Sequence, residues 1–276
     1  MGWLLALSSA VLYGISDFVG GIAARRIHFA TTAVLGQAVG LGVAVPLALL
    51  NGTGMRVADL GWGALSGLGT AAGMAALFRG LGRGTMSTVV PISTLTGMGL
   101  PVLFGVLAEG QRPTAAASLG VVVSLPALWL VSRTPDGAPV AVRGALADGL
   151  AAGVGIAIQY LALAHASAAS GLWPVAAGRV TAVCALVPLV LWAGAAWRVA
   201  SGPAALAATS GATAALALAA YLEATHRQLA VVAVALSSLY PVIPVVLGIT
   251  VLRERLTRGQ WAGLLIAALA VALLAH

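Results

Sequence analysis

Charged side chains are scarce in this chain: only 8% of its 276 residues are Asp, Glu, Lys or Arg, and lysine is absent. A water-soluble globular protein carries about 25% charged residues, so this chain has too few charges to cover a soluble surface. Hydrophobic residues make up 61% of the chain, and its mean hydropathy is +1.04. The composition therefore predicts an integral membrane protein with most of its exterior in lipid.

Cysteine and the usual catalytic motifs are also missing. Cys184 is the single cysteine, which excludes an intramolecular disulfide and a cysteine-cluster metal site. The four histidines lie near the ends of predicted spans, and the chain contains no HExxH motif, GxSxG motif, phosphate loop or dinucleotide-binding fingerprint. We therefore expect no enzyme activity, no catalytic residue, no metal and no cofactor.

The positive net charge does not point to nucleic acid. All 14 basic residues are arginines, and they are scattered singly or in pairs between apolar runs. Such arginines are typical of anchors near lipid phosphate groups. We expect the bilayer and a small-molecule substrate as partners, no nucleic acid, and a monomer or weak homodimer.

Long polar segments are absent as well, so the whole chain divides into apolar spans of about 20 residues. The first apolar stretch lacks a basic segment before it and is predicted to be a permanent helix rather than a signal peptide. Unbroken apolarity favours helices over the strands of a membrane barrel. The predicted helices are 3–24, 30–50, 60–81, 85–107, 114–132, 143–165, 170–195, 204–226, 230–251 and 258–275.

The two halves of the chain resemble each other. A shift of 142 residues aligns GQAVGLGVAVPLALL (36–50) with GRVTAVCALVPLVLW (178–192), and a shift of 145 aligns VLAE (106–109) with VLRE (251–254). This predicts two five-helix units, residues 1–135 and 136–276. Because five is odd, the second unit enters the membrane from the opposite side, which gives the inverted repeats common in secondary transporters.

The stretch SSLYPVIPVVLGITVLRERLTRGQWAGLLIAALAVALL (237–274) resembles the drug/metabolite transporter superfamily, EamA type. STVVPISTLTGMGLPVLFGVLAEGQRPT (87–114) is a weaker copy, and VLYGISDFVGG (11–21) resembles the family's first helix. The GRV at 178–180 resembles the family's arginine in the second helix of a repeat, whereas Gln37 occupies the corresponding place in the first half. The resemblance covers essentially the whole chain.

The resemblance implies ten helices, two repeats and transport across the cytoplasmic membrane. We expect a secondary transporter that moves small polar or amphipathic metabolites, amino-acid-like solutes or drugs, by alternating access. Export, by proton antiport or by uncoupled facilitation, is expected on family grounds. The alternatives are a non-transporting membrane scaffold or receptor and a membrane-embedded enzyme.

Asp17 is the only charged side chain among the first 24 residues. Charges near a bilayer centre cost about 2.5–3.5 kcal/mol on insertion scales and rarely face lipid. Under the 142-residue shift Asp17 aligns with Gln159, and Gln37 aligns with Arg179. Asp17 could bind a cationic group or a proton, or it could be neutralised by Arg179. Arg179 could alternatively bind a substrate carboxylate or backbone carbonyls.

Further candidates for the lining of a central cavity are aromatic and hydroxyl side chains. Prolines are expected to break the fourth helix (Pro91, Pro101) and the ninth (Pro241, Pro244), and a break can form a hinge, line a site or be a static kink. The candidate substrate-binding residues are Tyr13, Asp17, Gln37, Ser93, Gln159, Tyr160, Arg179, Ser238 and Tyr240. For any single aromatic residue, packing is the competing interpretation.

Three further acidic residues are expected to be structural. Glu223 precedes Arg227 by four residues, the spacing of an ion pair on a helix. Asp148 follows Arg143 near a helix start, and Glu109 lies at a helix end near Arg112. GxxxG spacings at 36–40, 63–67, 69–73, 149–153 and 259–263 predict close helix packing.

The orientation of the chain is left open by two opposing indications. The family pattern implies that both termini are in the cytoplasm. Under that topology the outer connections would hold nine arginines and the inner connections three, whereas the positive-inside rule prefers the reverse. The arginine count therefore favours termini outside.

Overall fold

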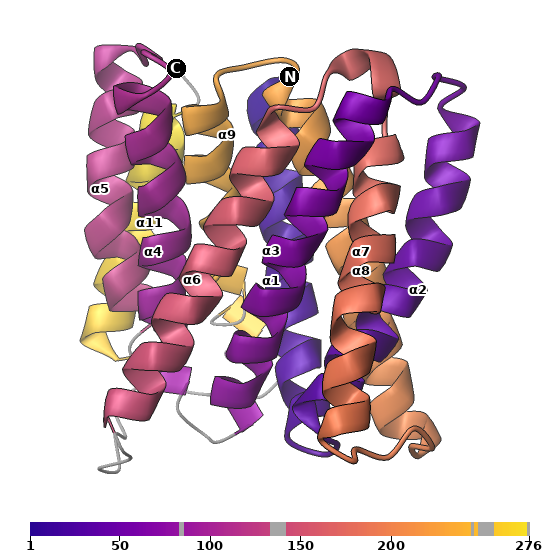
Figure 1. Ribbon diagram of the computed structural model, residues 1–276. Coiled ribbons are helices and arrows are strands. Elements are labelled where there is room, and N and C mark those ends of the chain that lie inside the picture. Colours follow the sequence, from indigo (N-terminus) through magenta and orange to yellow (C-terminus); the bar gives the residue numbers. More distant parts are fainter. Residues whose placement is uncertain (83–85, 133–141, 244–245, 248–256, 275–276) are drawn as a thin grey trace.

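A computed structural model describes residues 1–82, 86–132, 142–243, 246–247 and 257–274 of the chain (Figure 1). Within these ranges the secondary structure is helical and no strand occurs. The helices are α1 (Gly2–Ala24), α2 (Phe29–Leu50), α3 (Val57–Gly82), α4 (Met86–Leu107), α5 (Ala115–Ser132), α6 (Val142–Ala164), η1 (Ala168–Ser170), α7 (Trp173–Trp192), α8 (Ser201–Thr225), α9 (Ala230–Ser237) and α11 (Arg258–Leu274).

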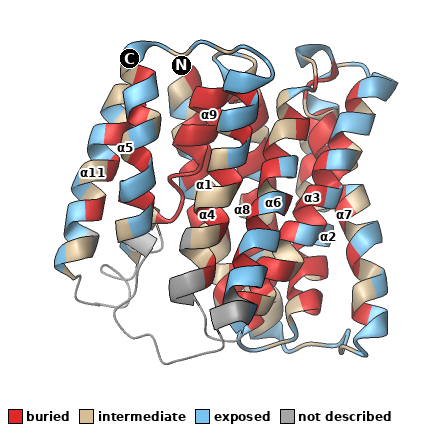
Figure 2. Ribbon diagram, turned by 60° about the vertical axis from the view of Figure 1, so that its left-hand side comes forward, coloured by how far each residue is buried: buried red, intermediate tan, exposed pale blue. Residues whose placement is uncertain are grey.

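Six helices in the described part of the chain are long and apolar enough to cross a membrane: α1, α2, α3, α6, α7 and α8. Shorter apolar helical stretches are Ile92–Leu107, Ala115–Leu130 and Trp261–Leu274. The chain is therefore an all-α, multi-pass membrane protein, as its composition predicts. Figure 2 shows buried residues concentrated on the inward faces of the helices and exposed residues on the outer faces.

Helices from the two halves of the sequence interleave. The helix α3 packs against α6 and α7, the helices α1 and α2 both pack against α8, and α4 packs against α6. The helices α5 and α11 pack against each other and stand together at one edge of the bundle (Figures 1 and 2). The expected boundary at residues 135/136 lies outside the described residues.

Glycines produce the closest of these helix contacts, as the GxxxG spacings predict. A Cβ atom added to Gly67 would lie 2.2 Å from the carbonyl oxygen of Gly178, and one added to Gly211 would lie 1.8 Å from that of Gly36. A Cβ on Gly69 would lie 2.6 Å from the carbonyl oxygen of Gly155. Backbones in contact at these distances leave no room for a side chain, so these helix pairs depend on glycine.

The helix predicted for residues 230–251 is interrupted, as its prolines predict, and helical residues resume at 242. The helix α9 stops at Ser237, and residues 238–241 form turns. Pro241 explains this end, because its nitrogen cannot donate to the carbonyl of Ser237 and its ring disfavours a helical conformation at Tyr240. The helix α4, in contrast, stays helical through Pro91 and Pro101. Pro244 lies outside the described residues.

The start of α1 and the end of α11 lie at the same end of the bundle (Figure 1), which we call the termini end. The connections 51–56, 108–114, 165–172 and 226–229 are also at this end, and the connections 25–28 and 193–200 are at the opposite end. Arg56, Arg112 and Arg227 lie at the termini end, and Arg25, Arg26 and Arg198 at the opposite end.

Candidate functional site

A small cavity lies between α1, α3 and α6, closed on one side by Tyr240 from the turn that follows α9. Its volume is about 20 Å³, which is room for about one water molecule. The lining residues are Tyr13, Asp17, Thr70, Gly73, Met74, Leu77, Ile156, Gln159, Tyr160 and Tyr240. Residues from both halves of the sequence therefore form its wall, and in this conformation the cavity is too small for a metabolite.

Asp17 places a carboxyl group on this wall. Tyr13 and Asp17 are four residues apart on α1 and so lie on the same helix face. Gly14 allows α1 to approach the turn after α9, because a Cβ there would lie 2.6 Å from the carbonyl oxygen of Tyr240. Within the described part of the chain, no hydrogen bond or salt bridge to the Asp17 side chain is found. A carboxyl group without a protein partner, at membrane depth and on a cavity wall, can accept a proton or bind a cation.

Gln159 and Tyr13 form a buried polar chain beside Asp17. The Nε2 atom of Gln159 donates to the Tyr13 hydroxyl at 2.7 Å, and the Thr70 hydroxyl donates to Oε1 of Gln159 at 2.5 Å. These bonds join α1, α3 and α6 across the two halves of the chain. Asp17 and Gln159, which the repeat aligns with each other, thus line the same cavity.

All four tyrosines of the chain gather around this site. The ring centroid of Tyr13 lies 6.1 Å from that of Tyr160 and 6.2 Å from that of Tyr240. The rings of Tyr160 and Tyr221 are 4.5 Å apart. Aromatic pairs at such distances are favourable contacts, so the tyrosines form a continuous cluster that extends from the cavity towards the termini end.

Three residues in or beside the tyrosine cluster were not among the candidate substrate-binding residues: Thr70, Thr94 and Tyr221. The Tyr240 hydroxyl lies 3.0 Å from Oγ1 of Thr94, and the Tyr221 hydroxyl donates to the carbonyl oxygen of Tyr160 at 3.0 Å. Thr70 holds Gln159 in place. Threonine and tyrosine are common in membrane helices, so only their positions in the fold distinguish these three.

Gln37 and Arg179 form a separate buried pair. The Nη1 atom of Arg179 donates to Oε1 of Gln37 at 2.6 Å, and each residue is only 1% exposed. The Nε and Nη2 atoms of Arg179 have no hydrogen-bond partner among the described residues. No ion pair joins Arg179 to Asp17 within that part of the chain, so of the partners considered for Arg179 the structure supports neither Asp17 nor a backbone carbonyl, and shows the Gln37 amide instead. Neither residue of the pair lines the cavity.

The two candidate serines lie near the cavity but not on its wall. Ser93 is fully buried in α4, where its hydroxyl donates to the carbonyl of Val90 at 3.0 Å. Ser238 is 1% exposed and lies in the turn after α9. The structure thus brings five candidates to the cavity wall and leaves out four: Gln37, Ser93, Arg179 and Ser238.

The other acidic side chains of the described residues take part in ion pairs or hydrogen bonds. Glu223 pairs with Arg227, as its spacing predicts. Asp148 pairs with Arg79 of α3 across the two halves, and the side chain of Arg143, its expected neighbour, lies outside the described residues. Glu109 pairs with His165 at 3.0 Å rather than with Arg112.

Asp59 is an acidic residue whose role the sequence did not indicate. It accepts hydrogen bonds from the backbone and the hydroxyl of Ser167, at 2.9 and 2.6 Å, and from the Ser170 hydroxyl at 2.6 Å. These bonds fasten the start of α3 to the connection between α6 and α7 at the termini end. Its partners are more than 100 residues away in the chain, so no local pattern marks them.

Metal chemistry finds no support in the described residues, where no group of three or more His, Cys, Asp or Glu side chains could hold a metal ion. No family model matches the chain, and no curated protein matches it. A solved structure described only as "Crystal structure of protein" is similar over 99% of this chain and 98% of that chain, with a TM-score of 0.78 and 18% identity. This similarity shows the fold alone.

Proposed function

We propose that the chain is a secondary transporter of the EamA type within the drug/metabolite transporter superfamily. It has ten membrane-spanning helices, arranged as two inverted repeats of residues 1–135 and 136–276. It moves small polar or amphipathic metabolites across the cytoplasmic membrane by alternating access, as an exporter and not as an enzyme. The observation that carries the proposal is Asp17, a carboxyl group that has no hydrogen-bond or ion-pair partner among the described residues and lies on the wall of a cavity built by both halves.

The helix packing supports the inverted repeat. The helix α1 packs against α8 as α6 packs against α3, and α2 packs against α8 as α7 packs against α3. These pairs exchange under the proposed repeat, in which α1 corresponds to α6, α2 to α7 and α3 to α8. The close glycine contacts follow the same relation, because Gly36 meets Gly211 and its mate Gly178 meets Gly67.

The small size of the cavity fits one state of an alternating-access cycle. A transporter closes around its site before it opens to the other side, and inverted repeats place that site near the membrane midplane. A volume of about 20 Å³ therefore represents a closed conformation, and outward or inward movement of α3 and α6 would enlarge it. A non-transporting scaffold would keep the cavity closed.

The transport proposal is tested by flux in liposomes. We expect purified wild-type protein to carry at least one member of a panel of amino acids, nucleosides and amphipathic amines, and Asp17→Asn to lower that flux at least tenfold. The amide cannot carry a negative charge or take part in proton exchange, although its size is the same. The measurement is radiolabelled efflux with and without a pH gradient.

Glu223→Gln is the matched control for this experiment, because it also neutralises a carboxylate but lies in an exposed ion pair. We expect its flux to equal that of the wild type. Absence of flux for the whole panel would contradict the transport proposal and favour a scaffold. Wild-type flux in Asp17→Asn would remove Asp17 from the site while leaving transport intact.

The orientation is tested by reporters fused to the C-terminus. A cytoplasmic C-terminus makes a fused fluorescent protein bright, and an external C-terminus makes a fused alkaline phosphatase active. The first outcome supports the family pattern, and the second supports the arginine count.

A further inference from the structure

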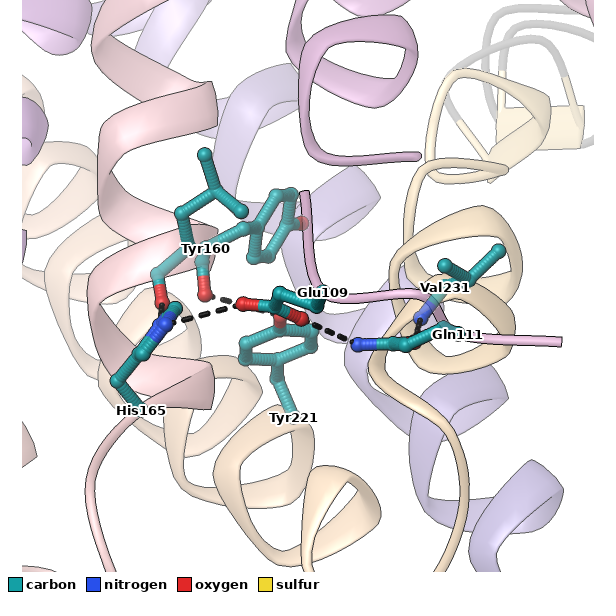
Figure 3. A network of polar contacts seen from close by, with 7 residues as sticks. Glu109, Gln111, Tyr160, His165, Tyr221 and Val231 are labelled. Atoms are coloured by element: carbon teal, nitrogen blue, oxygen red, sulfur yellow. Dashed lines mark hydrogen bonds and ion pairs between the residues drawn. The ribbon is translucent and has the colours of Figure 1, made fainter. Parts of the chain in front are cut away.

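A network of polar contacts lies at the termini end, between the cavity and the surface (Figure 3). The Nε2 atom of His165 is 3.0 Å from Oε1 of Glu109, and its Nδ1 atom is 2.7 Å from the carbonyl oxygen of Leu161. The Gln111 side chain donates to Oε2 of Glu109 at 2.6 Å and accepts from the backbone of Val231 at 3.1 Å. The network thus joins the α4–α5 connection to the end of α6 and the start of α9.

When Glu109 is ionised, both contacts of the His165 ring are satisfied only if each ring nitrogen carries a proton. The carbonyl of Leu161 can only accept a hydrogen bond, so the nitrogen that faces it carries a proton. The carboxylate of Glu109 also can only accept, so the second nitrogen carries a proton as well. A histidine with both nitrogens protonated is a cation. The contact with Glu109 is therefore a charge-assisted hydrogen bond, and loss of the proton would leave two acceptors facing each other.

This pair lies directly beyond the cavity. Tyr160 lines the cavity, and His165 is five residues further along α6, which corresponds to about 7.5 Å along a helix. The carbonyl of Tyr160 accepts a hydrogen bond from the Tyr221 hydroxyl at 3.0 Å, so the tyrosine cluster continues from the cavity towards this end. Figure 3 shows Glu109 close to Tyr160 and Tyr221.

The pair also joins parts of the chain that alternating access would separate. Glu109 and Gln111 belong to the first proposed repeat, and His165 and Val231 belong to the second. The side chains of His165 and Glu109 are 33% and 29% exposed, so water and protons reach them. The ring of His165 also lies 4.7 Å from that of Trp62, a contact that keeps the histidine in place.

The neighbouring charged and titratable groups have other partners or face solvent. Asp59 is bound by Ser167 and Ser170, and the Nε2 atom of His226 lies 2.9 Å from the carbonyl of Ala166. Arg56 donates to Ser167, and Arg112 is exposed. Glu223 and Arg227 pair with each other, and the Tyr221 hydroxyl donates to the carbonyl of Tyr160. Glu109 is thus the carboxylate that the structure pairs with the His165 ring.

We propose that Glu109 and protonated His165 form a proton-binding latch that holds the termini end of the transport route closed. The role of the latch in closing a transport route rests on the proposed function, but the latch itself can be tested without measuring transport. Histidine changes its charge between about pH 5 and 8. The latch is closed while His165 carries both protons and is released as the pH rises and the ring loses one. The site thereby links proton concentration to opening of this end of the protein.

The test measures a distance across the termini end of the protein directly. Spin labels are attached to Ala108→Cys and Ala169→Cys, two exposed positions on either side of the latch, in a Cys184→Ser background. Distances are recorded by double electron–electron resonance at pH 5.5 and pH 8 in lipid nanodiscs without substrate. We expect the population with the longer distance to rise at least threefold at pH 8.

Two variants decide whether the latch is responsible. In Glu109→Gln the longer population is expected to become independent of pH, whereas in the control Glu223→Gln it is expected to respond as in the wild type. A wild-type distance distribution that does not change with pH would overturn the proposal, and so would an unchanged pH response in Glu109→Gln. A pH-dependent distance across the termini end in a protein without flux would support the latch and contradict transport. Failure of the latch and failure of the transport proposal are therefore distinguishable.

Discussion

Gly211→Ala is expected to destabilise the folded protein by about 3 kcal/mol or more, the upper range for overpacking of a tightly packed interior. The added Cβ would lie 1.8 Å from the carbonyl oxygen of Gly36. This neighbour is helix backbone, which cannot rotate away as the end of a side chain can. The helices α2 and α8 would therefore have to move apart. The measurement is the free energy of unfolding in detergent micelles.

Gly42→Ala is the matched control, because Gly42 lies in the partner helix α2 and a Cβ there has no neighbour within 4 Å. It is expected to leave stability within about 1 kcal/mol of the wild type, the size of the difference in helix propensity between glycine and alanine. Equal stabilities of the two variants would contradict the close contact between α2 and α8. The corresponding contact between α3 and α7, where a Cβ on Gly67 would lie 2.2 Å from the carbonyl oxygen of Gly178, predicts a similar loss for Gly67→Ala.

The fold class followed from composition, because the scarcity of charge and the length of the apolar runs are properties that the sequence contains directly. The break in the ninth helix was predicted from Pro241, but the end of α9 at Ser237 was not marked by hydropathy. Hydropathy continues without interruption past Ser237, and the effect of Pro241 on backbone hydrogen bonds overrides it. The GxxxG spacings indicated close helix contacts, but they did not indicate which helices would meet.

The candidate site was predicted in part for a similar reason. Asp17 and Gln159 stand out because polar side chains are rare in these helices, and the repeat aligned them. The partner of Arg179 was less certain, since an arginine can be satisfied by a carboxylate, an amide or carbonyls. The latch was missed, because Glu109 and His165 are 56 positions apart in the sequence. Their meeting depends on how α4 and α6 pack.

Gln37→Leu is expected to destabilise the protein by about 3–5 kcal/mol, the cost of leaving a buried charge without its partner. Arg179 is 1% exposed, and its Nη1 bond to Gln37 is the hydrogen bond that the structure gives its guanidinium group, since Nε and Nη2 lack partners among the described residues. Leucine would leave the cation without a partner at membrane depth. The measurement is again the free energy of unfolding in micelles.

The double variant Gln37→Leu/Arg179→Met is used to decide whether Arg179 is a structural bridge or a residue that binds substrate. It removes the charge together with its partner, and replacement of a buried polar pair by apolar residues of similar volume is often neutral or stabilising. We therefore expect the double variant to be more stable than Gln37→Leu alone, which makes the two substitutions strongly non-additive. A double variant at least as unstable as Gln37→Leu would contradict this account.

Flux through the same variant then shows why the arginine is there. Gln37 and Arg179 are mates under the 142-residue repeat and bind each other, so they lie where the axis relating the two proposed repeats passes between α2 and α7. A structural bridge predicts normal flux in a stable double variant, because an apolar pair can hold the same two helices together. An arginine that binds a substrate carboxylate in another conformation predicts a stable protein with its flux lost. The Nε and Nη2 atoms of Arg179, which lack hydrogen-bond partners among the described residues, favour this second outcome.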